Sequence, residues 1–519
     1  MPLNKSINRR DFLKLLGGAA VTGVLSGCSL SPSPASTEQP KSEKGLAPKA
    51  VADVEVLEMS NRPNIVFLMV DDLDSLLGTT DYMPHLKAEI ADQGLTFEQF
   101  FVTSPLCSPS RATFLNGQYT HSHGVLRNEP PSGGFEELNL SGKESSTVAT
   151  WLQAAGYRTA FMGKYLNGYP WKDAKVYSPA GWSEWISAAA GKPYYEYDYT
   201  LNENGTLVDY GHEPQDYLTD VLSAKAKEFI TRSASSPEPF FLYLTPYVPH
   251  GPFTPAPRHA ELFQDLIAPR TPAFNEEDVS QKPSQIRNDP LLSEADIQEL
   301  DKIYRLRVQA MQAVDEMIAM LITTLKKIGQ LDNTYVIFTS DNGFHMGQHR
   351  QRNGKDLPYE EDIRVPFLVR GPGIPAGQVI NEFLVGNVDF APTIAELAGV
   401  VPPNYVDGRS LVPFFGDRKP ELSQWRKVYP LEFYPHKVDE GEDPTSPAYL
   451  AARTQDFLFV EHRTGFREFY DLKTDPDQLY NLADSTDKDF LDQVSAWMVA
   501  FHVSQGQGCR ELENNFPQF

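Results

Sequence analysis

The feature that most limits how this chain can fold is an apolar run, Ile65 to Val70, that ends in two adjacent aspartates, Asp71 and Asp72. An uninterrupted apolar run is typical of a strand that is buried on both faces of a parallel sheet. Open α/β sheets bind ligands at the carboxyl ends of such strands. Two neighbouring carboxylates repel each other unless a cation lies between them. The pair therefore indicates either a metal site or a turn in which both aspartates accept backbone hydrogen bonds.

A second strand with a similar ending is predicted at Thr334–Thr339, where β-branched and aromatic residues precede Asp341 and Asn342. The alternative there is an ordinary Asn-Gly turn. Further buried strands are predicted at Tyr157–Met162 and Pro239–Tyr247, and the periodicity of Ile297–Ile328 predicts one or two long helices beside the sheet. These alternating elements predict an α/β fold.

Cys107 begins a predicted helix, and the apolar, aromatic run before it, Leu95 to Pro105, predicts a strand. The free N–H groups at a helix N-terminus favour an anion. Arg111 lies four residues further on and therefore on the same helix face. A nucleophile, a helix dipole and an arginine converge on one point, which suits an anionic substrate group. A buried structural cysteine is the alternative interpretation.

The length of 519 residues suits one large α/β domain, predicted at 61–424, and a smaller one at 425–519. The smaller one has strand-like runs at 427–434, 449–461 and 467–471 and a helix at about 486–505, which predict an antiparallel sheet with one packed helix. The net charge of −23 argues against a nucleic-acid partner. An anionic substrate would need a local positive pocket.

The N-terminus has the features of an export signal, predicted at 1–28. Arg9 and Arg10 open a run that resembles a twin-arginine motif, and the sequence around Cys28 resembles a bacterial lipobox. This resemblance implies acylation of Cys28 and a lipoprotein of the bacterial cell envelope, on the periplasmic or surface side, exported by the twin-arginine route. An ordinary signal peptide with a chance cysteine is the alternative. The polar segment 29–60 predicts a flexible tether.

The segment Cys107-Ser108-Pro109-Ser110-Arg111, with Leu115 and Gly117 behind it, resembles the maturation motif of the type I, formylglycine-dependent sulfatases. The resemblance implies an alkaline-phosphatase-like sandwich with a large mixed sheet flanked by helices. It also implies that a maturation enzyme oxidises Cys107 to formylglycine, whose hydrated aldehyde is the catalytic nucleophile. The metal ligands that it implies, for Ca²⁺ or Mg²⁺, are Asp71, Asp72, Cys107, Asp341 and Asn342.

The same resemblance assigns the remaining site residues. Arg111, Lys164 and Lys355 would contact the sulfate, with Arg350 and Arg352 as alternatives to Lys355, and His250 would lie near the leaving oxygen. Asn167, His345 and His349 are weaker substrate-contact candidates.

Many sulfatases have a histidine where this chain has Leu166. The run from Lys164 to Asn167 instead resembles the N-acetylglucosamine-6-sulfatase and extracellular endosulfatase branch. The departure leaves open which group accepts the proton when sulfate is expelled.

Three other residues have weaker signals of a functional role. His121 and His123 lie in a glycine-containing loop and could touch substrate, although most such histidines are only hydrogen-bonded or exposed. Cys509 is interpreted as a free thiol near the C-terminus.

The sequence as a whole predicts a sulfatase that acts on a sulfated sugar, a polysaccharide or an aryl sulfate. Two alternatives stay open: a phosphate or phosphonate monoester hydrolase of the same fold, and a non-catalytic lipoprotein that binds sulfated glycan. Comparing the rates on matched sulfate and phosphate esters would distinguish a sulfatase from the first alternative. Binding of sulfated glycan without turnover would favour the second.

Overall fold

The computed structural model describes residues 62–416, 419–437, 443 and 445–518. The predicted signal, the tether and Cys28 lie outside the described residues. Among the helices of the described ranges, none combines the length and the apolar character that crossing a membrane requires.

The strand β1 (Asn64–Val70) lies in the middle of the large sheet and is buried along its whole length. Its side chains alternate between two apolar cores. Ile65, Phe67 and Met69 pack into one core, and Val66 and Val70 pack into the other. Both faces of the sheet are therefore covered, which explains why the run is continuously apolar.

Within the described residues the large sheet has ten strands in the order β13-β2-β12-β9-β1-β8-β4-β5-β6-β7. The central strands β9, β1, β8, β4 and β5 are parallel to one another. The strand β12 runs antiparallel to β9 and β2, and β6 and β7 continue the sheet in antiparallel fashion beyond β5. The bounds of the nine strands besides β1 are Leu95–Phe97 (β2), Arg158–Gly163 (β4), Glu184–Gly191 (β5), Tyr199–Glu203 (β6), Thr206–Tyr210 (β7), Phe240–Thr245 (β8), Thr334–Ser340 (β9), Phe367–Arg370 (β12) and Gln378–Ile380 (β13).

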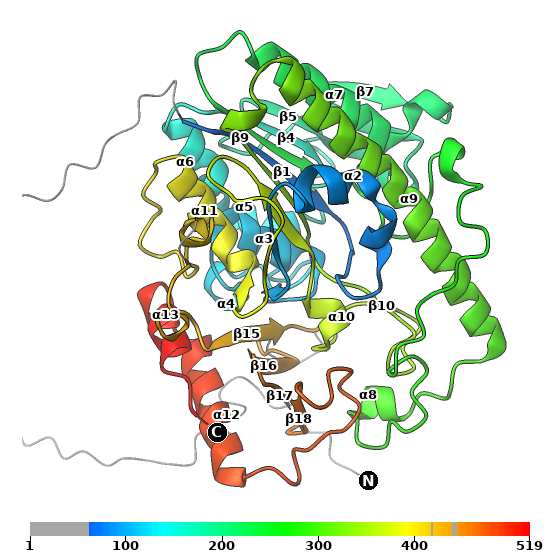
Figure 1. Cartoon of the computed structure of the whole chain (residues 1–519), viewed down its shortest axis with the longest axis vertical. Coiled ribbons are helices and arrows are strands. Elements are labelled where there is room, and N and C mark those ends of the chain that lie inside the picture. Colours follow the sequence, from blue (N-terminus) through cyan, green and yellow to red (C-terminus); the bar gives the residue numbers. More distant parts are fainter. Residues whose placement is uncertain (1–61, 417–418, 438–442, 444, 519) are drawn as a thin grey trace, which may run out of the picture.

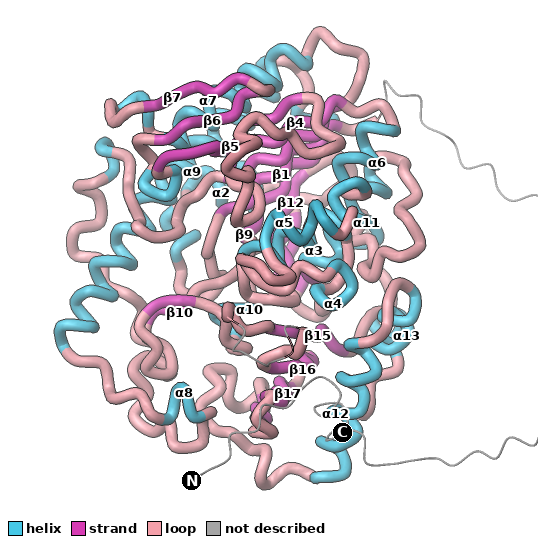
Figure 2. The backbone as a smooth tube through the Cα atoms, turned by 180° about the vertical axis from the view of Figure 1, so that it is seen from behind, coloured by secondary structure: helices cyan, strands magenta, loops and turns pink. Residues whose placement is uncertain are grey.

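Helices cover both faces of this sheet (Figures 1 and 2). One face carries α3 (Cys107–Asn116), α5 (Gly134–Leu140), α6 (Val148–Ala154) and α11 (Phe390–Leu397). The other carries α2 (Pro84–Leu86), α7 (Leu218–Ser233) and α9 (Glu294–Lys327). The predicted long helix is a single one, α9, which begins at a capping box formed by Ser293 and Asp296. The remaining short helices are α4 (Thr120–His123), α8 (Ser284–Arg287) and α10 (Glu360–Ile363).

A smaller antiparallel sheet lies at the lower end of the molecule in both views (Figures 1 and 2). Its order is β15 (Val428–Phe433), β16 (Tyr449–Thr454), β17 (Phe457–His462) and β18 (Arg467–Asp471). The helices α12 (Lys488–His502) and α13 (Gln507–Asn514) pack with it around a separate apolar core. The predicted fold class, a large mixed sheet with helices and a small antiparallel sheet, is confirmed.

Two predictions about strands were wrong in detail. The run Leu95–Pro105 contains two short strands, β2 and β3 (Phe100–Phe101), and not one. The strand-like run 449–461 is a hairpin of β16 and β17. Three further two-residue strands complete the described set: β10 (His345–Met346), β11 (Asn353–Gly354) and β14 (Val385–Gly386).

Candidate active site

The site lies where four parallel strands end at the same edge of the large sheet. Asp71 follows β1, Asp341 follows β9, Lys164 follows β4, and the loop after β8 leads to His250. Gly163, the last residue of β4, has a φ of 118°, and a Cβ added there would lie 2.0 Å from the backbone oxygen of Thr245. Only glycine permits this close approach of β4 to β8, so Gly163 fixes the place of Lys164.

Cys107 reaches this edge from α3. The helix is buried over its whole length, and Cys107 is 1% exposed at its first residue. The backbone N–H of Ser108 donates to Asn128 Oδ1 at 2.9 Å, and Ser110 donates through Oγ to the backbone oxygen of Asp341. Asn387 donates to Ser110 Oγ at 2.9 Å. The helix N-terminus is thus tied directly to the end of β9.

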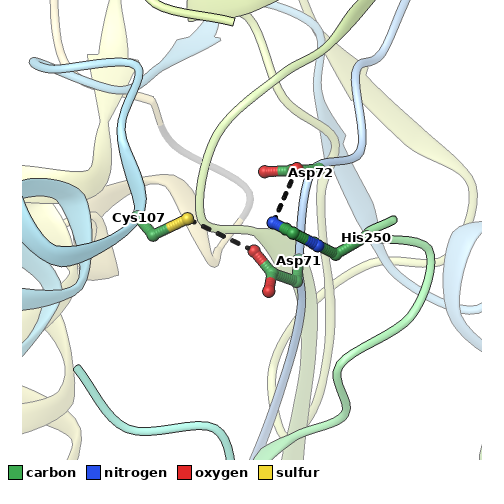
Figure 3. Close-up of side chains that lie close together, drawn as sticks. All are labelled: Asp71, Asp72, Cys107 and His250. Carbon is green, nitrogen blue, oxygen red and sulfur yellow. Dashed lines mark hydrogen bonds and ion pairs between the residues drawn. The ribbon is translucent and has the colours of Figure 1, made fainter. Parts of the chain in front are cut away.

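The sulfur of Cys107 lies between a lysine and an aspartate. Lys355 Nζ donates to Sγ at 2.8 Å, and Sγ lies 3.6 Å from Asp71 Oδ1 (Figure 3). Burial raises the pKa of the Cys107 thiol to about 12, although Lys164 and Lys355 oppose that effect. The unmodified thiol is therefore protonated at neutral pH and is a poor nucleophile.

Two buried lysines pair with the two aspartates that follow β1. Lys164 Nζ contacts Asp71 Oδ2, and Lys355 Nζ contacts Asp72 Oδ1. Burial alone would raise the pKa of Asp71, but Lys164 and its other cationic neighbours hold it well below its usual value. Burial likewise opposes ionisation of Asp72, and Lys355 outweighs it to lower the pKa. Both carboxylates are therefore charged at neutral pH.

The acid and amide groups suit a hard divalent cation. Asp71, Asp72 and Asp341 are 0–2% exposed, and Asn342 donates through Nδ2 to Asp72 Oδ1 at 2.7 Å. The amide oxygen of Asn342 is buried and has no hydrogen-bond partner among the described residues. An unsatisfied amide oxygen beside carboxylates fits a Ca²⁺ or Mg²⁺ ligand set. Ligand atoms of Asp71, Asp72, Cys107 and His250 also lie within 4.8 Å of one another.

Arg111 joins three parts of the site. Its Nε donates to Asp341 Oδ2 at 2.8 Å, and its Nη1 donates to the backbone oxygen of Lys164 at 2.7 Å. Its Nη2 lies 3.7 Å from Asp71 Oδ1 and has no hydrogen-bond partner among the described residues. A buried guanidinium with a free donor is a suitable partner for an anionic substrate oxygen.

His250 is the more open member of the site, with a side chain that is 29% exposed. Its Nε2 lies 3.6 Å from Asp72 Oδ2 (Figure 3). Its Nδ1 lies 2.7 Å from the backbone oxygen of Gly251. A carbonyl oxygen can only accept, so Nδ1 carries a hydrogen. In the neutral ring the lone pair therefore lies on Nε2, on the side of the aspartates.

The weaker candidates occupy supporting places. Asn167 Oδ1 accepts a hydrogen bond from Ser108 Oγ at 3.0 Å, so it braces the start of α3. His345 Nδ1 pairs with Asp362 at 2.8 Å, beside the short strand that precedes Lys355.

His349 lies in different surroundings. Its Nδ1 pairs with Glu276 at 2.6 Å, and its ring packs against Tyr359. Neither partner belongs to the cluster around Cys107.

Sequence reasoning missed two residues that border the site. Arg307 is buried on α9 and donates to the backbone oxygen of Asp72 at 2.6 Å. An arginine on the apolar face of a predicted helix is a signal that could have found it. Tyr194 lies with its ring centroid 4.6 Å from that of His250 and 5.2 Å from Lys164 Nζ. It comes from a segment for which no element was predicted.

A cavity of about 310 Å³ lies beside Lys164. Tyr194 and Tyr247 line it, together with the loop after β4 and the end of β5. It is large enough for a small organic group, and the ring of Tyr194, which lines it, packs against the ring of His250.

Two family models match this chain. The model described as Sulfatase matches residues 63–400, and the model described as N-sulphoglucosamine sulphohydrolase, C-terminal, matches residues 347–499.

Relatives with names agree with these models. The chain is 34% identical to human N-acetylglucosamine-6-sulfatase over 87% of its own length and 86% of that protein. It is 38% identical to an extracellular sulfatase Sulf-1 homolog of Caenorhabditis elegans over 72% of its own length, and it spans about half, 53%, of that relative. Among solved structures, a protein in complex with its substrate D-glucosamine-2-N,6-O-disulfate superposes with a TM-score of 0.66 and 28% identity, covering 81% of this chain and 93% of that one.

Proposed function

This chain belongs to the sulfatase family of sulfuric ester hydrolases, and we propose that it removes a sulfate group from a sulfated sugar. The observation that carries this proposal is the convergence of three buried cations, Arg111, Lys164 and Lys355, on the edge of the sheet where Cys107 lies. Human N-acetylglucosamine-6-sulfatase, and the solved complex with a disulfated glucosamine, support a sugar as the substrate class.

The charges of the site support an anionic substrate. The site contains three carboxylates (Asp71, Asp72, Asp341) and three cations (Arg111, Lys164, Lys355), so their formal charges sum to zero. A divalent cation on the acidic side would leave a net positive charge, which the sulfate group of a substrate would balance.

We propose that Asp71, Asp72, Asp341 and Asn342, with matured Cys107, would hold Ca²⁺ or Mg²⁺. When bound, such an ion supplies Lewis acidity and a lower pKa for a hydroxyl group that it contacts.

The chain's own residues would then handle the sulfate and the leaving alcohol. Arg111, Lys164 and Lys355 would neutralise charge on the sulfate oxygens. His250 would hold a proton at Nε2 and deliver it to the leaving alcohol oxygen, because its Nδ1 is already engaged with a carbonyl.

We further propose that Cys107 is converted to formylglycine by a maturation enzyme. The high pKa of the unmodified thiol supports this, because a protonated thiol cannot provide a strong nucleophile at neutral pH. The hydrate of the aldehyde supplies a hydroxyl as nucleophile in its place.

The cavity beside Lys164 supports a carbohydrate leaving group. Tyr194 and Tyr247 present aromatic surface there, next to polar backbone, and the ring of Tyr194 also packs against that of His250. Aromatic rings with a polar tip bind amphipathic groups such as sugar rings well.

For localisation, the proposal rests on sequence motifs. The paired arginines Arg9 and Arg10 and the lipobox-like Cys28 support export by the twin-arginine route and a lipid anchor in a bacterial cell envelope.

The test combines a mass measurement with a matched pair of substrates. We expect the proteolytic peptide that contains Cys107, from protein made in its native host, to have the mass of the aldehyde or its hydrate. We also expect faster turnover of glucosamine 6-sulfate than of glucosamine 6-phosphate. An unmodified thiol in a host that matures other such proteins, or a preference for the phosphate, would contradict the proposal.

A further inference from the structure

A second group of ligand-type side chains lies where the short helix α4 meets the small sheet and its helix α12. His121 is on α4, Glu432 is on β15 and His502 is the last residue of α12. Their side chains are 5–6% exposed, and one ligand atom from each lies within 4.8 Å of the others. We call these three residues the interlayer cluster, because α4 belongs to the large sheet's half of the molecule and β15 and α12 belong to the small sheet's half.

The hydrogen bonds of His121 are unusual. Nδ1 lies 2.9 Å from Glu432 Oε1, and Nε2 lies 3.0 Å from the backbone oxygen of Ser504. Both partners are acceptors, whereas a neutral imidazole has only one N–H. His121 must therefore either carry an extra proton or present the lone pair of Nδ1 to a cation that lies between it and Glu432.

The surroundings favour positive charge at this place. Glu432 Oε1 also accepts the backbone N–H of His121 at 3.0 Å, and Oε2 accepts from the hydroxyl of Tyr434 at 3.0 Å. His502 Nδ1 lies 3.3 Å from Oε2. Burial lowers the pKa of His121, but Glu432, with help from Asp407, raises it overall.

The arrangement also has features of a metal centre. The hydrogen bond from His121 Nε2 to the carbonyl of Ser504 is the kind of outer contact that fixes the tautomer of a metal-binding histidine. A small cavity of about 10 Å³ is lined by all three residues, with Trp497 and Phe501 on its apolar side. A space of this size holds roughly one water molecule, which could fill a fourth ligand position.

We propose that the interlayer cluster is a second metal site, which binds Zn²⁺ or a similar transition-metal cation through His121 Nδ1, Glu432 and His502 Nδ1. Two imidazoles, one carboxylate and a water form a tetrahedral ligand set that zinc accepts. Such a site differs in chemistry from the oxygen-rich set around Asp72. The ion replaces the proton on His121 and joins the two halves of the molecule. This proposal does not depend on the sulfatase activity.

Calorimetry tests the proposal on the full chain. All proteins carry Cys107→Ser, so that no thiolate at the active site competes, and all are titrated with Zn²⁺ in millimolar Ca²⁺, which fills the hard-oxygen site. We expect one equivalent of Zn²⁺ with a Kd tighter than about 10 μM. His502→Gln should weaken binding by about 100-fold or more, since even loss of an outer-shell partner costs 10–100-fold.

The matched control is His462→Gln. His462 is a buried histidine of β17 that pairs with Glu468 at 2.6 Å, and it lies outside the interlayer cluster. Its replacement should leave Zn²⁺ affinity unchanged.

A second readout follows the folding equilibrium. Zn²⁺ at 100 times its Kd should raise the folding equilibrium constant of the parent by about 100-fold and should have no such effect on His502→Gln.

X-ray absorption of the Zn²⁺-loaded parent needs no further variant, so it decides the matter even if His502→Gln fails to fold. Two imidazole ligands in the zinc shell would support the proposal. An oxygen-only shell, the absence of binding tighter than about 10 μM, or equal affinity in His502→Gln would overturn it.

Discussion

The Cys107 site and the interlayer cluster both combine buried carboxylates with basic groups, yet they are built differently. At the Cys107 site, Asp71, Asp341 and Lys164 come from the ends of parallel strands, and the site leaves atoms unsatisfied, among them Asn342 Oδ1 and Arg111 Nη2. In the interlayer cluster, Glu432 accepts hydrogen bonds on both carboxylate oxygens. Unsatisfied polar atoms at the Cys107 site indicate a place for substrate and cofactor, whereas the hydrogen-bonded carboxylate of Glu432, between two halves of the molecule, indicates a structural role that the proposed metal ion would share.

The largest effect is expected from replacing Cys107, the proposed nucleophile position. Cys107→Ala should lower kcat by more than about a thousandfold, because loss of a catalytic nucleophile is among the most damaging changes. The unfolding temperature should stay close to that of the parent. Cys509→Ala is the matched control, since Cys509 is the other buried free thiol of the described residues. Steady-state kinetics with glucosamine 6-sulfate measures both, and near-parental rates from Cys107→Ala would contradict the site.

Substitutions in the interlayer cluster should instead lower the free energy of unfolding. Glu432→Gln removes the charge that His121 and His502 face, and breaking a buried ion pair costs about 3–5 kcal/mol. Urea unfolding of metal-free protein should register this loss, while turnover per folded molecule stays the same. If Glu432→Gln instead lowered turnover and left stability unchanged, the cluster would act in catalysis and not in stability, which would contradict this prediction.

Arg111→Lys tests whether the guanidinium acts by geometry or only by charge. Lysine keeps the charge but cannot bond Asp341 and the backbone of Lys164 together while offering a third donor. We expect kcat/KM to fall by about 100- to 1000-fold, the cost of one preorganised transition-state donor. If the lysine variant keeps parental rates, charge alone accounts for the role of Arg111.

Glu196 offers a third kind of buried carboxylate, one with no ion-pair partner among the described residues. It accepts hydrogen bonds from the N–H and hydroxyl of Thr219, and burial raises its pKa to about 8. The unfolded chain releases this proton at lower pH, so stability is lost as pH rises from the unfolded value towards 8.

Glu196→Gln should remove that dependence. The difference in unfolding free energy between parent and variant should change by about 2 kcal/mol between pH 6 and pH 8. Urea titrations at a series of pH values measure it, and parallel curves would mean that Glu196 is not protonated in the native state.

The smallest effect is expected at Tyr194. Tyr194→Ala should raise KM about tenfold with little change in kcat, because an aromatic contact contributes about 0.5–1.5 kcal/mol. Tyr194→Phe keeps the ring and should keep the parental KM. Equal defects in both variants would assign the effect to the hydroxyl, which lies near Lys164, and not to the ring.

The central strands were predictable because each has a local signal. The strands β1 and β9 are buried throughout and consist mainly of apolar, β-branched and aromatic residues, since helices cover both faces of the sheet, and their polar endings follow directly in the sequence. The residues that meet at the Cys107 site could be proposed together for that reason, with the family resemblance supplying their roles.

The strands β5, β6 and β7 were missed although a local signal was present for two of them. Asn204 and Gly205 both have positive φ, 52° and 89°, and form the two-residue turn between β6 and β7. An Asn-Gly pair between alternating strands is a strong hairpin signal.

The interlayer cluster could not have been predicted by such means. His121 and Glu432 are 311 residues apart in the sequence, and neither is part of a recognisable spacing with His502. Only the packing of α4 against β15 and α12 brings them together.

The burial of Cys107 has a consequence for the order of events in the life of the chain. The residue is 1% exposed and begins a helix with no exposed residue, so a second protein cannot bind this segment once α3 has packed. If a maturation enzyme converts the thiol, it must do so while the segment is still extended, during or soon after synthesis. Chains that fold before modification would stay inactive permanently. The fraction of active molecules would therefore depend on the rate of modification relative to the rate of folding.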